Sequence, residues 1–518
     1  MGLFRGRKKQ KSKNRNEEAF SIALVKKLDT NLDNLRKMLD KPIDLVIREF
    51  PVRGTEHKCA VVFIDGLIDM ELVQNNIMKN LQLVKGKEQL PDEKIKFFEA
   101  IYCEIISITD IKKGNTLDEV SNAILYGKTV FYLDGVDQVL IMETQGWESR
   151  MPEEPVTETV IRGPREGFVE NLQTNLMLIR RYIRDPNLRF ETQQVGKRSK
   201  KNLVVSYMAG IINPDIVKEV NRRLKTIDMD DAPESGYIEQ WIEDSFLSPF
   251  PQIINTERPD KVSAALLQGK VAIILDGTPF VLLVPFTLGN ALQSPEDYYE
   301  RWTVGTLLRV LRYFSAFIAI FLPALYIALI SYHQGMIPSK LAFSIAASRE
   351  GVPFPAFVEA ILMTVTMEML REAGARLPKT IGQTIGIVGG LVIGEAAVSA
   401  GIVSPIMVIV VAVNAIASFS IPTYSVAIAF RIIQFGFMFA AAVFGLYGII
   451  LAYIMVNIHI VNLKSVGVPY STPFAPTFLK DWTDLVLRAP IPTLTKRPKY
   501  MQTNDDISGD EADQKGDQ

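Results

Sequence analysis

The sequence predicts an α+β protein with a membrane part: duplicated cytosolic α/β subdomains followed by a polytopic α-helical transmembrane domain. Two observations predict this fold class, namely the uneven distribution of charge and an internal repeat. Only 11 charged side chains fall in the 151 residues from Tyr313 to Leu463, whereas the other 367 residues carry 104. Soluble domains are about 25% charged on average. The part of the chain before Arg301 is therefore typical of soluble protein, and the later stretch is typical of a membrane domain.

The N-terminal segment is basic. MGLFRGRKKQKSKNR (1–15) contains seven Lys or Arg side chains with no apolar stretch behind them, which does not match a secretory signal peptide. We therefore expect a partly disordered arm, followed by a soluble half that stays in the cytosol. The arm is either simply solvated or in contact with anionic lipid. The formal charge of −1 for the whole chain gives no indication of a nucleic-acid partner.

The soluble half contains two copies of one pattern. LYGKTVFYLDG (125–135) parallels LQGKVAIILDG (267–277) at an offset of 142 in the numbering, and the glycines that close AVVFIDG (60–66) and LVVSYMAG (203–210) are 144 apart. In each copy a strand, a turn and a helix precede a second strand, which an Asp-Gly turn joins to a return strand. Between the copies we expect a helix in ENLQTNLMLIRRYIR (170–184), flanked by Pro- and Gly-rich loops.

These patterns divide the chain into six segments. The predicted boundaries are 1–40 for the basic arm, 41–150 for the first subdomain, 151–202 for the connecting helix and loops, 203–300 for the second subdomain, 301–463 for the transmembrane domain with an inserted helix at 354–372, and 464–518 for a cytosolic C-terminal segment. The end of that last segment is acidic and polar, so we expect disorder from about residue 500.

The sequence gives no sign of a catalytic, metal or cofactor site. Gly127-Lys128-Thr129 lacks the glycine that a phosphate-binding loop has five residues earlier, so we interpret the Gly-Lys pairs as turns before buried strands. His57 and Cys59 have no second pair of metal ligands nearby. The two cysteines cannot form a disulfide framework. We expect a protein that is not an enzyme and that binds no metal or cofactor.

Four apolar stretches predict the membrane spans. They are Phe314–Ile330, Ile381–Gly401, Val403–Ile421 and Ser425–Ile460. The last stretch would form about 54 Å of helix, whereas the hydrocarbon core of a bilayer is about 30 Å thick. We expect it to fold as two spans that break near Phe444-Gly445, or else to continue as one long helix out of the bilayer.

Lys and Arg side chains beside these stretches predict the orientation. They lie before the first stretch, before the second and after the last: Arg301, Arg309, Arg312, Arg371, Arg376, Lys379 and Lys464. Positive side chains near span ends stay on the cytosolic side. All of these can be cytosolic if Pro353–Leu370 dips into the membrane from the far side or crosses it. The prediction is five full spans and a membrane-inserted helix, with both termini inside.

The inserted helix carries an unusual number of charges for its apolar surroundings. Pro353 and Pro355 are placed to start it, and Glu359, Glu368 and Arg371 follow. One interpretation is a packing helix whose carboxylates pair with nearby basic side chains. The other is a helix whose carboxylates line a water-filled route for cations. The pattern leaves both open.

Glu395 lies two-thirds of the way along the second apolar stretch. A charge at the centre of a membrane helix costs about 2.5–3.5 kcal/mol on insertion scales. Packing alone does not explain such a carboxylate, so we expect it to be protonated, paired with Arg431, or facing an aqueous cavity with a role in conduction or gating. Small residues beside it predict close helix packing: Gly386, Gly389, Gly390 and Gly394. Asn414 predicts a hydrogen bond between helices rather than a pore ligand.

Several long motifs resemble the A-subunit family of GerA-type spore germination receptors. They follow in collinear order from about Asp65 to about Pro492 and include REGFVENLQTNLMLIRRYIRDPNLRFE, SPEDYYERW, SIAASREGVPFPAFVEAILM and LREAGARLPKTIGQTIGIVGGLVIGEAAVSAG. The resemblance implies the inner membrane of the bacterial endospore. It also implies a permease-like B subunit and a lipoprotein C subunit as partners, and a homo-oligomer of A subunits around a pore that nutrient opens to monovalent cations.

The resemblance also implies a role for individual residues. The segment Pro353–Arg376 is similar to the family stretch proposed to line or gate the pore, so Glu359 and Glu368 are pore candidates together with Glu395. Arg371, Asn414 and Arg431 are secondary candidates. Beside a nutrient-gated cation channel subunit, the alternatives that remain open are a scaffold that clusters receptors, an accessory germination channel homologue that acts without its own nutrient, and a secondary transporter. The absence of an inverted hydropathy repeat disfavours the transporter.

Overall fold

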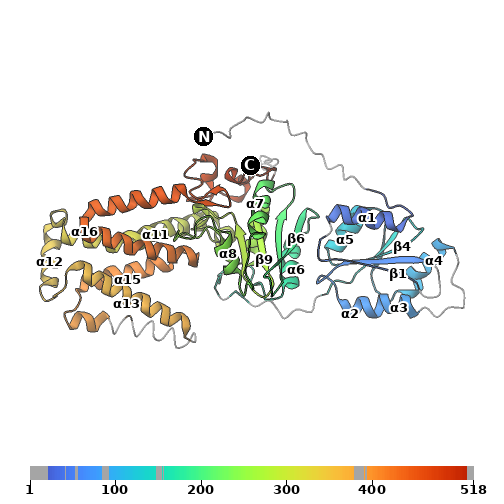
Figure 1. Cartoon of the computed structure of the whole chain (residues 1–518), viewed down its shortest axis with the longest axis horizontal. Coiled ribbons are helices and arrows are strands. Elements are labelled where there is room, and N and C mark those ends of the chain that lie inside the picture. The colour runs from blue at the N-terminus through green and yellow to red at the C-terminus, as the bar shows by residue number, and fades with distance from the viewer. Residues whose placement is uncertain are drawn as a thin grey trace. The chain divides into compact units, whose positions relative to one another are not determined.

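The computed structural model describes residues 22–40, 42–52, 57–83, 93–146, 154–155, 157–377, 390 and 394–509. The chain divides into two compact units (Figure 1). The first comprises Met1–Met151 and Leu176–Arg189, and the second comprises Pro152–Asn175 and Phe190–Gln518. Residues 1–21 of the predicted basic arm lie outside the described residues, whereas 22–40 are described and contain a helix at Leu28–Leu39, so the first subdomain begins earlier than predicted.

The first unit is built on a five-stranded antiparallel sheet in the order β1-β2-β4-β5-β3. The strands are β1 (Leu45–Pro51), β2 (Lys58–Ile64), β3 (Ile111–Gly114), β4 (Thr129–Leu133) and β5 (Val139–Met142). The helices are α1 (Leu28–Leu39), α2 (Met70–Leu72), α3 (Lys79–Leu83), α4 (Lys94–Ala100) and α5 (Leu117–Leu125), with π-helical turns at Val73–Met78 and Ile101–Ile105. Side chains alternate across β2, so Val61 and Phe63 share a core with Phe97 and Phe98 of α4, whereas α1 and α5 contact the strand from the other face.

The second unit begins with a sheet of the same design, in the order β6-β7-β9-β10-β8. Its strands are β6 (Leu188–Val195), β7 (Lys201–Met208), β8 (Ile254–Thr256), β9 (Val271–Leu275) and β10 (Val281–Val284). The helices that accompany this sheet are α6 (Leu172–Tyr182), α7 (Pro214–Leu224), α8 (Ser235–Ile242), α9 (Pro259–Leu267) and α10 (Glu296–Tyr299). Most of α6 and the first two residues of β6 fall in Leu176–Arg189, which is grouped with the first unit. The identical strand order confirms the predicted duplication. We call Leu28–Met142 the first repeat and Leu172–Val284 the second.

The duplication extends to single hydrogen bonds. The Asn31 amide accepts from the backbone N–H of Val25 at 3.0 Å and donates to its carbonyl at 2.6 Å. Asn175, at the equivalent position of the second repeat, makes the same pair of bonds with Val169 at 2.8 and 2.6 Å. Each asparagine therefore satisfies the backbone of the chain that enters the first helix of its repeat.

The Asp-Gly turns are duplicated in the same way. Asp134 accepts a hydrogen bond from the first amide of α1 at 3.2 Å, and Asp276 accepts one from the first amide of α6 at 3.3 Å. Carboxylates at helix N-termini satisfy free amides and interact well with the helix dipole. Gly135 and Gly277 follow with φ of +93° each, where glycine avoids the strain of a side chain.

The second repeat begins earlier than the sequence predicts. The pattern indicates only a connecting helix and loops for 151–202, but this segment contains α6 and β6, the counterparts of α1 and β1. β6 is an edge strand whose sequence LRFETQQV is only partly buried. It lacks the continuous apolar run of a central strand, and this is why the pattern does not identify it.

The C-terminal segment completes the core of the second repeat. It contains the short strands β11 (Lys464–Ser465) and β12 (Val468–Pro469) and 3-10 turns at Leu479–Thr483, Ile491–Thr493 and Lys499–Met501. Tyr500 and Met501 are buried in the same hydrophobic cluster as Leu203 and Ile273. The predicted disorder from about residue 500 is therefore wrong for the stretch up to 509, because these two apolar side chains fix it, while 510–518 lie outside the described residues.

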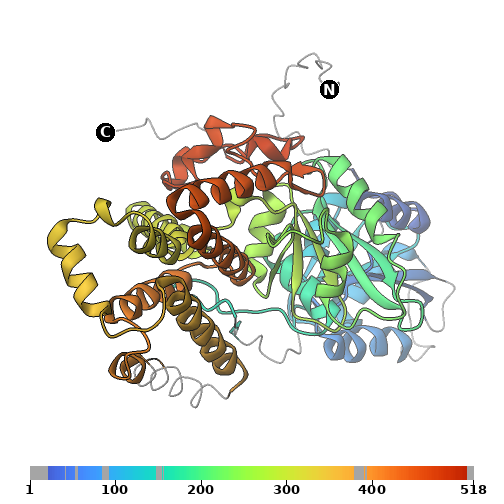
Figure 2. The ribbon, with the colours of Figure 1, turned by 60° about the vertical axis from the view of Figure 1, so that its left-hand side comes forward.

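The remaining helices form an apolar bundle. They are α11 (Trp302–Ser331), α12 (Ser339–Arg349), α13 (Ala356–Arg376), α15 (Pro405–Phe419) and α16 (Tyr424–Asn462), and α11 lies beside α16 (Figure 2). Among the described residues, α11 and α16 are long and apolar enough to cross a membrane. The predicted span at 403–421 forms only the 15-residue helix α15, and most of the predicted span at 381–401 lies outside the described residues.

The predicted break in the last apolar stretch is confirmed. Gly445 interrupts α16 with non-helical angles, φ 58° and ψ −138°. Such a break frees carbonyls of the preceding turn, and the hydroxyl of Tyr332 donates to those of Ala442 and Val443. A side chain at position 445 would meet the ring of His333 at 2.8 Å. Glycine is therefore required here for both its conformation and its size.

Candidate functional site

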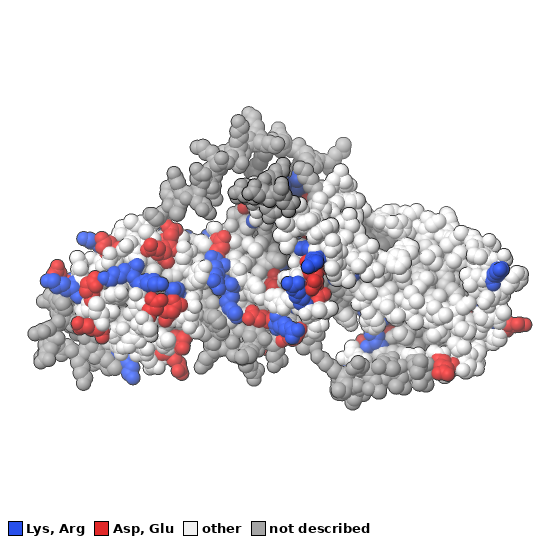
Figure 3. All heavy atoms as spheres, turned by 180° about the vertical axis from the view of Figure 1, so that it is seen from behind, with Lys and Arg blue, Asp and Glu red and all other residues white. Residues whose placement is uncertain are grey.

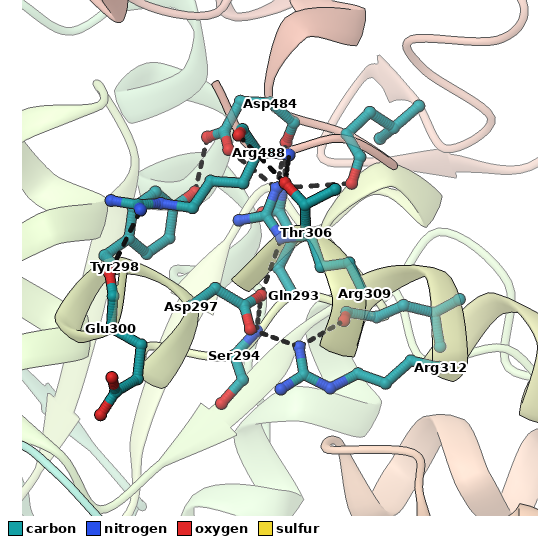
Figure 4. Close-up of polar contacts among 12 residues, drawn as sticks. Gln293, Ser294, Asp297, Tyr298, Glu300, Thr306, Arg309, Arg312, Asp484 and Arg488 are labelled. Atoms are coloured by element: carbon teal, nitrogen blue, oxygen red, sulfur yellow. Dashed lines mark hydrogen bonds and ion pairs between the residues drawn. The ribbon is translucent and has the colours of Figure 1, made fainter. Parts of the chain in front are cut away.

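Five charged residues, four of them buried and Asp484 partly exposed, form a cluster that we call the arginine junction: Asp297, Arg309, Arg312, Asp484 and Arg488 (Figure 4). They come from three parts of the second unit. Asp297 lies on α10 beside the second repeat, Arg309 and Arg312 lie on the first turns of α11, and Asp484 and Arg488 lie in the C-terminal segment. The network therefore ties the first apolar helix to the soluble fold.

Asp297 is the centre of the junction and is completely buried. It accepts from Arg309 Nε at 2.8 Å and from Arg312 Nη1 at 2.6 Å, and the backbone N–H of Ser294 donates to it at 3.2 Å. A buried charge is tolerated only when partners and hydrogen bonds compensate it. Two guanidinium groups and one amide provide that compensation here.

Asp484 holds the other side of Arg309. Arg309 Nη1 lies 2.7 Å from Asp484 Oδ1, and the hydroxyl of Tyr298 donates to Oδ2 at 2.6 Å. The guanidinium of Arg488 stacks over the Tyr298 ring at 5.4 Å, and its backbone N–H donates to Thr306 on α11 at 3.1 Å. Burial raises the pKa of Tyr298, so its hydroxyl remains a donor to the carboxylate.

The junction adds to one sequence interpretation. The sequence alone treats Arg309 and Arg312 as flanking charges that set the orientation, and the structure shows that both are also buried in ion pairs with Asp297. Their spacing of three residues places them on one face of α11. That spacing is visible in the sequence, whereas the partner carboxylates, 12 and 175 residues away, are not.

Glu359 occupies a second buried cluster, within the helix bundle. It is 1% exposed, forms an ion pair with Arg349 of α12 at 2.9 Å and accepts from the backbone N–H of Ser404 at 2.9 Å. Arg349 also donates to Tyr326 of α11 at 3.3 Å. One carboxylate thus joins α12, α13 and the start of α15. This geometry favours the packing interpretation of Glu359 over the pore interpretation, and Arg349 is a partner that the sequence analysis missed.

Glu368 lies with the two secondary arginine candidates. It is 2.6 Å from Arg371 and 3.5 Å from Arg431 of α16, and Arg371 also donates to Ser418 of α15 at 3.2 Å. Two arginines against one carboxylate leave a positive excess, which repels cations. The sequence suggests Arg431 as a partner for Glu395, but the structure pairs it with Glu368.

Asn414 lies in the bundle as predicted, between helices. Its amide is 3.3 Å from that of Gln434 on α16. When the amide is flipped, so that its oxygen and nitrogen exchange places, its nitrogen donates to the carbonyl of Ala319 on α11 at 3.0 Å. Both arrangements are helix-to-helix hydrogen bonds.

Glu395 differs from the other carboxylates in its surroundings. Its side chain is exposed, and no ion pair or hydrogen bond reaches it from the described residues. The preceding Gly394 lies against α15, where an added methyl group would be 3.4 Å from Val408. Gly390 has open space around it, whereas Gly386 and Gly389 lie outside the described residues. Gly394 is therefore the glycine of this group that the structure shows against α15, and the neighbouring carboxylate of Glu395 is exposed.

The described residues contain no group of three or more His, Cys, Asp or Glu side chains arranged to hold a metal ion. Cys59, which the sequence places two residues after His57, is buried, and burial raises the pKa of its thiol to about 12. It donates to the carbonyl of Phe50.

Fold and sites together define a class of protein with two copies of an α/β repeat. Buried ion pairs beside the second repeat join it to a bundle of apolar helices. The model of the Bacillus/Clostridium GerA spore germination protein family matches residues 33–500. The chain therefore belongs to the GerA family, and its resemblance to the A subunits of that family is confirmed.

The relatives match over nearly their whole length. Spore germination protein GerLA of Bacillus cereus is 53% identical over 474 residues, which cover 92% of this chain and 95% of that protein. Spore germination protein B1 of Bacillus subtilis (strain 168) is 42% identical over 482 residues, 93% of this chain and 98% of that protein. The solved N-terminal domain of the A subunit of the Bacillus megaterium spore germinant receptor GerK3 is 32% identical, with a TM-score of 0.40, and covers 51% of this chain and 96% of that domain.

Proposed function

We propose that this chain is the channel-forming subunit of a nutrient germinant receptor in the inner membrane of the endospore. It crosses the membrane several times, oligomerises, and opens to monovalent cations when nutrient binds a permease-like B subunit, with a lipoprotein C subunit as third component. The observation that carries the proposal is the exposed carboxylate of Glu395 on an apolar bundle in which the carboxylates of Glu359, Glu368 and Glu372 pair with arginines.

The surface of the bundle supports a membrane location. In Figure 3 charged side chains gather over the soluble repeats, and the helical part of the view is almost free of them. Large apolar side chains at least half exposed lie along α11, α15 and α16, among them Phe314, Ile416, Phe439, Phe444 and Met455. Apolar surface of this extent marks an interface with lipid or another subunit.

Glu395 supports the channel over a simple scaffold. An unpaired carboxylate in a membrane is costly unless it faces water or another subunit. A ring of such carboxylates around the axis of an oligomer attracts cations and repels anions. Glu359 and Glu368 support the scaffold instead, because their ion pairs serve packing.

The test is potassium release from spores that carry the complete receptor, after addition of a panel of nutrients. Glu395→Gln keeps the size of the side chain and removes the charge. We expect the rate of release or the selectivity for potassium over sodium to change by about tenfold, since ring charge sets cation selectivity. Glu372→Gln is the matched control, because Glu372 is also exposed but paired with Arg376 on the same helix.

The outcomes separate the two functions when all variants are compared at equal membrane abundance. Glu359→Gln should lower abundance without changing selectivity, because it removes a buried charge from its partner Arg349. If Glu395→Gln releases potassium as the unchanged receptor does, with the same selectivity, the carboxylate is not at a pore and the scaffold function replaces the channel.

A further inference from the structure

The two repeats have a lysine at the same position, but its charged partner is present only in the first repeat. Lys128 and Lys270 occupy the same position, directly before β4 and β9, at the offset of 142 that relates the two copies. In the first repeat Lys128 forms an ion pair with Glu143, directly after the return strand β5. The strand registers pair Thr129 with Met142 and, at the same offset in the second repeat, Val271 with Val284. The position of Glu143 is therefore occupied by Pro285 in the second repeat, and the carboxylate is lost.

Lys270 keeps its place without that carboxylate and is more deeply buried. It is 6% exposed, and its ammonium donates to the Asn290 amide oxygen at 2.9 Å. No carboxylate of the described residues lies in ion-pair distance. A buried ammonium normally requires a paired anion. An amide oxygen supplies a hydrogen bond but no compensating charge.

Lys270 lines a cavity of about 170 Å³ between α9, β10 and the loop before α10. The walls are mostly apolar, with Ile254, Ala265, Leu283 and Phe286 among them. This volume is below the roughly 300 Å³ of the smallest pockets for drug-sized ligands, so it suits a small molecule with a short apolar body. We call it the Lys270 cavity.

The other charged groups at the cavity already have partners. Lys261 pairs with Glu158 at 2.7 Å, and Asp260 pairs with Arg258 at 2.7 Å. The local charge is therefore positive by one, and the excess belongs to Lys270. An anion entering the cavity would meet one ammonium that is short of a counter-charge and two amide side chains, Gln268 and Gln293.

We propose that the Lys270 cavity is a binding site for a small organic carboxylate, whose charged group pairs with Lys270 and whose apolar body lies against Leu283 and Phe286. The bound carboxylate supplies the counter-charge that Glu143 supplies in the first repeat. The site lies in the soluble part of the second unit, so it does not depend on the channel function.

The test uses the full chain purified in detergent, with acetate, isobutyrate and benzoate as probes and inorganic phosphate as the competing simple anion. Saturable binding is measured by equilibrium dialysis up to about 10 mM, the range of weak small-ligand sites. Two variants remove the site in different ways. Lys270→Met deletes the charge, and Asn290→Asp places an isosteric carboxylate beside the ammonium. Lys128→Met is the matched control in the first repeat.

We expect at least one organic carboxylate to bind the unchanged chain. Its affinity should fall about tenfold or more in Lys270→Met and in Asn290→Asp, and should stay within about twofold in Lys128→Met. A loss of affinity in Asn290→Asp as well as in Lys270→Met would show that the effect is not due to misfolding, because Asn290→Asp keeps Lys270 and its surroundings in place. The proposal is overturned if no probe binds saturably, if both site variants bind as the unchanged chain does, or if phosphate alone binds, which would indicate a simple anion site.

Discussion

The first and second repeats share strand order, Asp-Gly turns and the asparagines that brace their first helices, yet their charged positions have diverged. Lys128 is paired within its own hairpin, whereas no carboxylate of the described residues lies in ion-pair distance of the buried Lys270. Only the second repeat continues into α10, whose Asp297 holds α11. The comparison teaches that the two copies share one backbone design, while Asp297, which follows the repeated elements, gives the second copy its connection to the helix bundle.

The largest expected effect breaks the feature that only the second repeat has. Asp297→Asn removes the carboxylate that neutralises Arg309 and Arg312 while both remain buried. Breaking a buried pair in this way costs about 3–5 kcal/mol. We expect the second repeat and the start of α11 to lose protection in hydrogen exchange of the full chain.

The control for Asp297→Asn is Asp215→Asn on α7, whose carboxylate is 84% exposed and pairs with Lys218. Exposed pairs contribute about 0–1 kcal/mol, so protection should stay nearly unchanged. Equal effects of the two substitutions would mean that the junction does not hold α11 to the soluble fold.

The next effect concerns pH and the unpaired lysine. Burial, and secondarily the charge of Lys261, lowers the pKa of Lys270 from 10.5 to about 8. Between these two pH values the unfolded chain holds a proton that the folded chain has released, so stability rises with pH across this window. The difference corresponds to about 3 kcal/mol. We expect the urea midpoint of the second repeat to rise from pH 8 to about 9.5, below the pH at which unfolded tyrosines ionise. The midpoint is followed by hydrogen exchange of β9 and corrected for the intrinsic exchange rate.

Other groups around the cavity do not produce this rise. The charged and titratable neighbours are Arg258, Asp260, Lys261, Glu158, Asp484, Tyr298, Tyr299 and Tyr500. Burial raises the pKa of all three tyrosines from 10.0, that of Tyr500 to about 12. The unfolded chain therefore releases these protons before the folded chain does, and the tyrosines lower stability near pH 10 instead of raising it. Lys270→Met should therefore remove the rise, and a rise that persists in this variant would assign it to another group. Carboxylate binding should weaken over the same range, because neutral Lys270 no longer attracts an anion.

The smallest expected effect tests the features that the repeats share. Asn31→Ala and Asn175→Ala each leave a backbone N–H and a carbonyl without their side-chain partner, at a cost of about 1–3 kcal/mol per site. Because the two geometries are alike, the losses of protection in α1 and α6 should agree within about 1 kcal/mol. A large difference between them would show that the repeats are equivalent in geometry but not in energy.

Local patterns in the sequence predict much of the fold. The repeat offset locates both hairpins, and the length of the last apolar stretch places the break at Gly445. The sequence pattern does not reveal the early start of the second repeat, because β6 is a partly exposed edge strand without a clear apolar run. Tyr500 and Met501 look like part of an acidic tail, because composition does not reveal that two apolar side chains enter a core.

The sites are less predictable because they depend on contacts between distant segments. Arg309 looks like a flanking charge until Asp484, 175 residues later, is brought beside it. Glu359 can be assigned to packing only when Arg349 and Ser404 are seen around it. Lys270 differs from these sites, because its local sequence resembles that of Lys128. The two lysines are distinguished only by the residue after the return strand, which is Glu143 in the first repeat and Pro285 in the second.

The break at Gly445 has a mechanical consequence for α16. A continuous helix of 39 residues would bend as a stiff rod, because bending it requires several backbone hydrogen bonds to lengthen together. In α16 the helix is already interrupted at Gly445, and the hydroxyl of Tyr332 donates to the carbonyls that the interruption frees. The segments before and after Gly445 are two shorter rods with a pivot between them. Rotation about the pivot stretches the two hydrogen bonds of the Tyr332 hydroxyl rather than a series of backbone hydrogen bonds. The direction of the segment after Gly445 is therefore set chiefly by the side chains that pack against it.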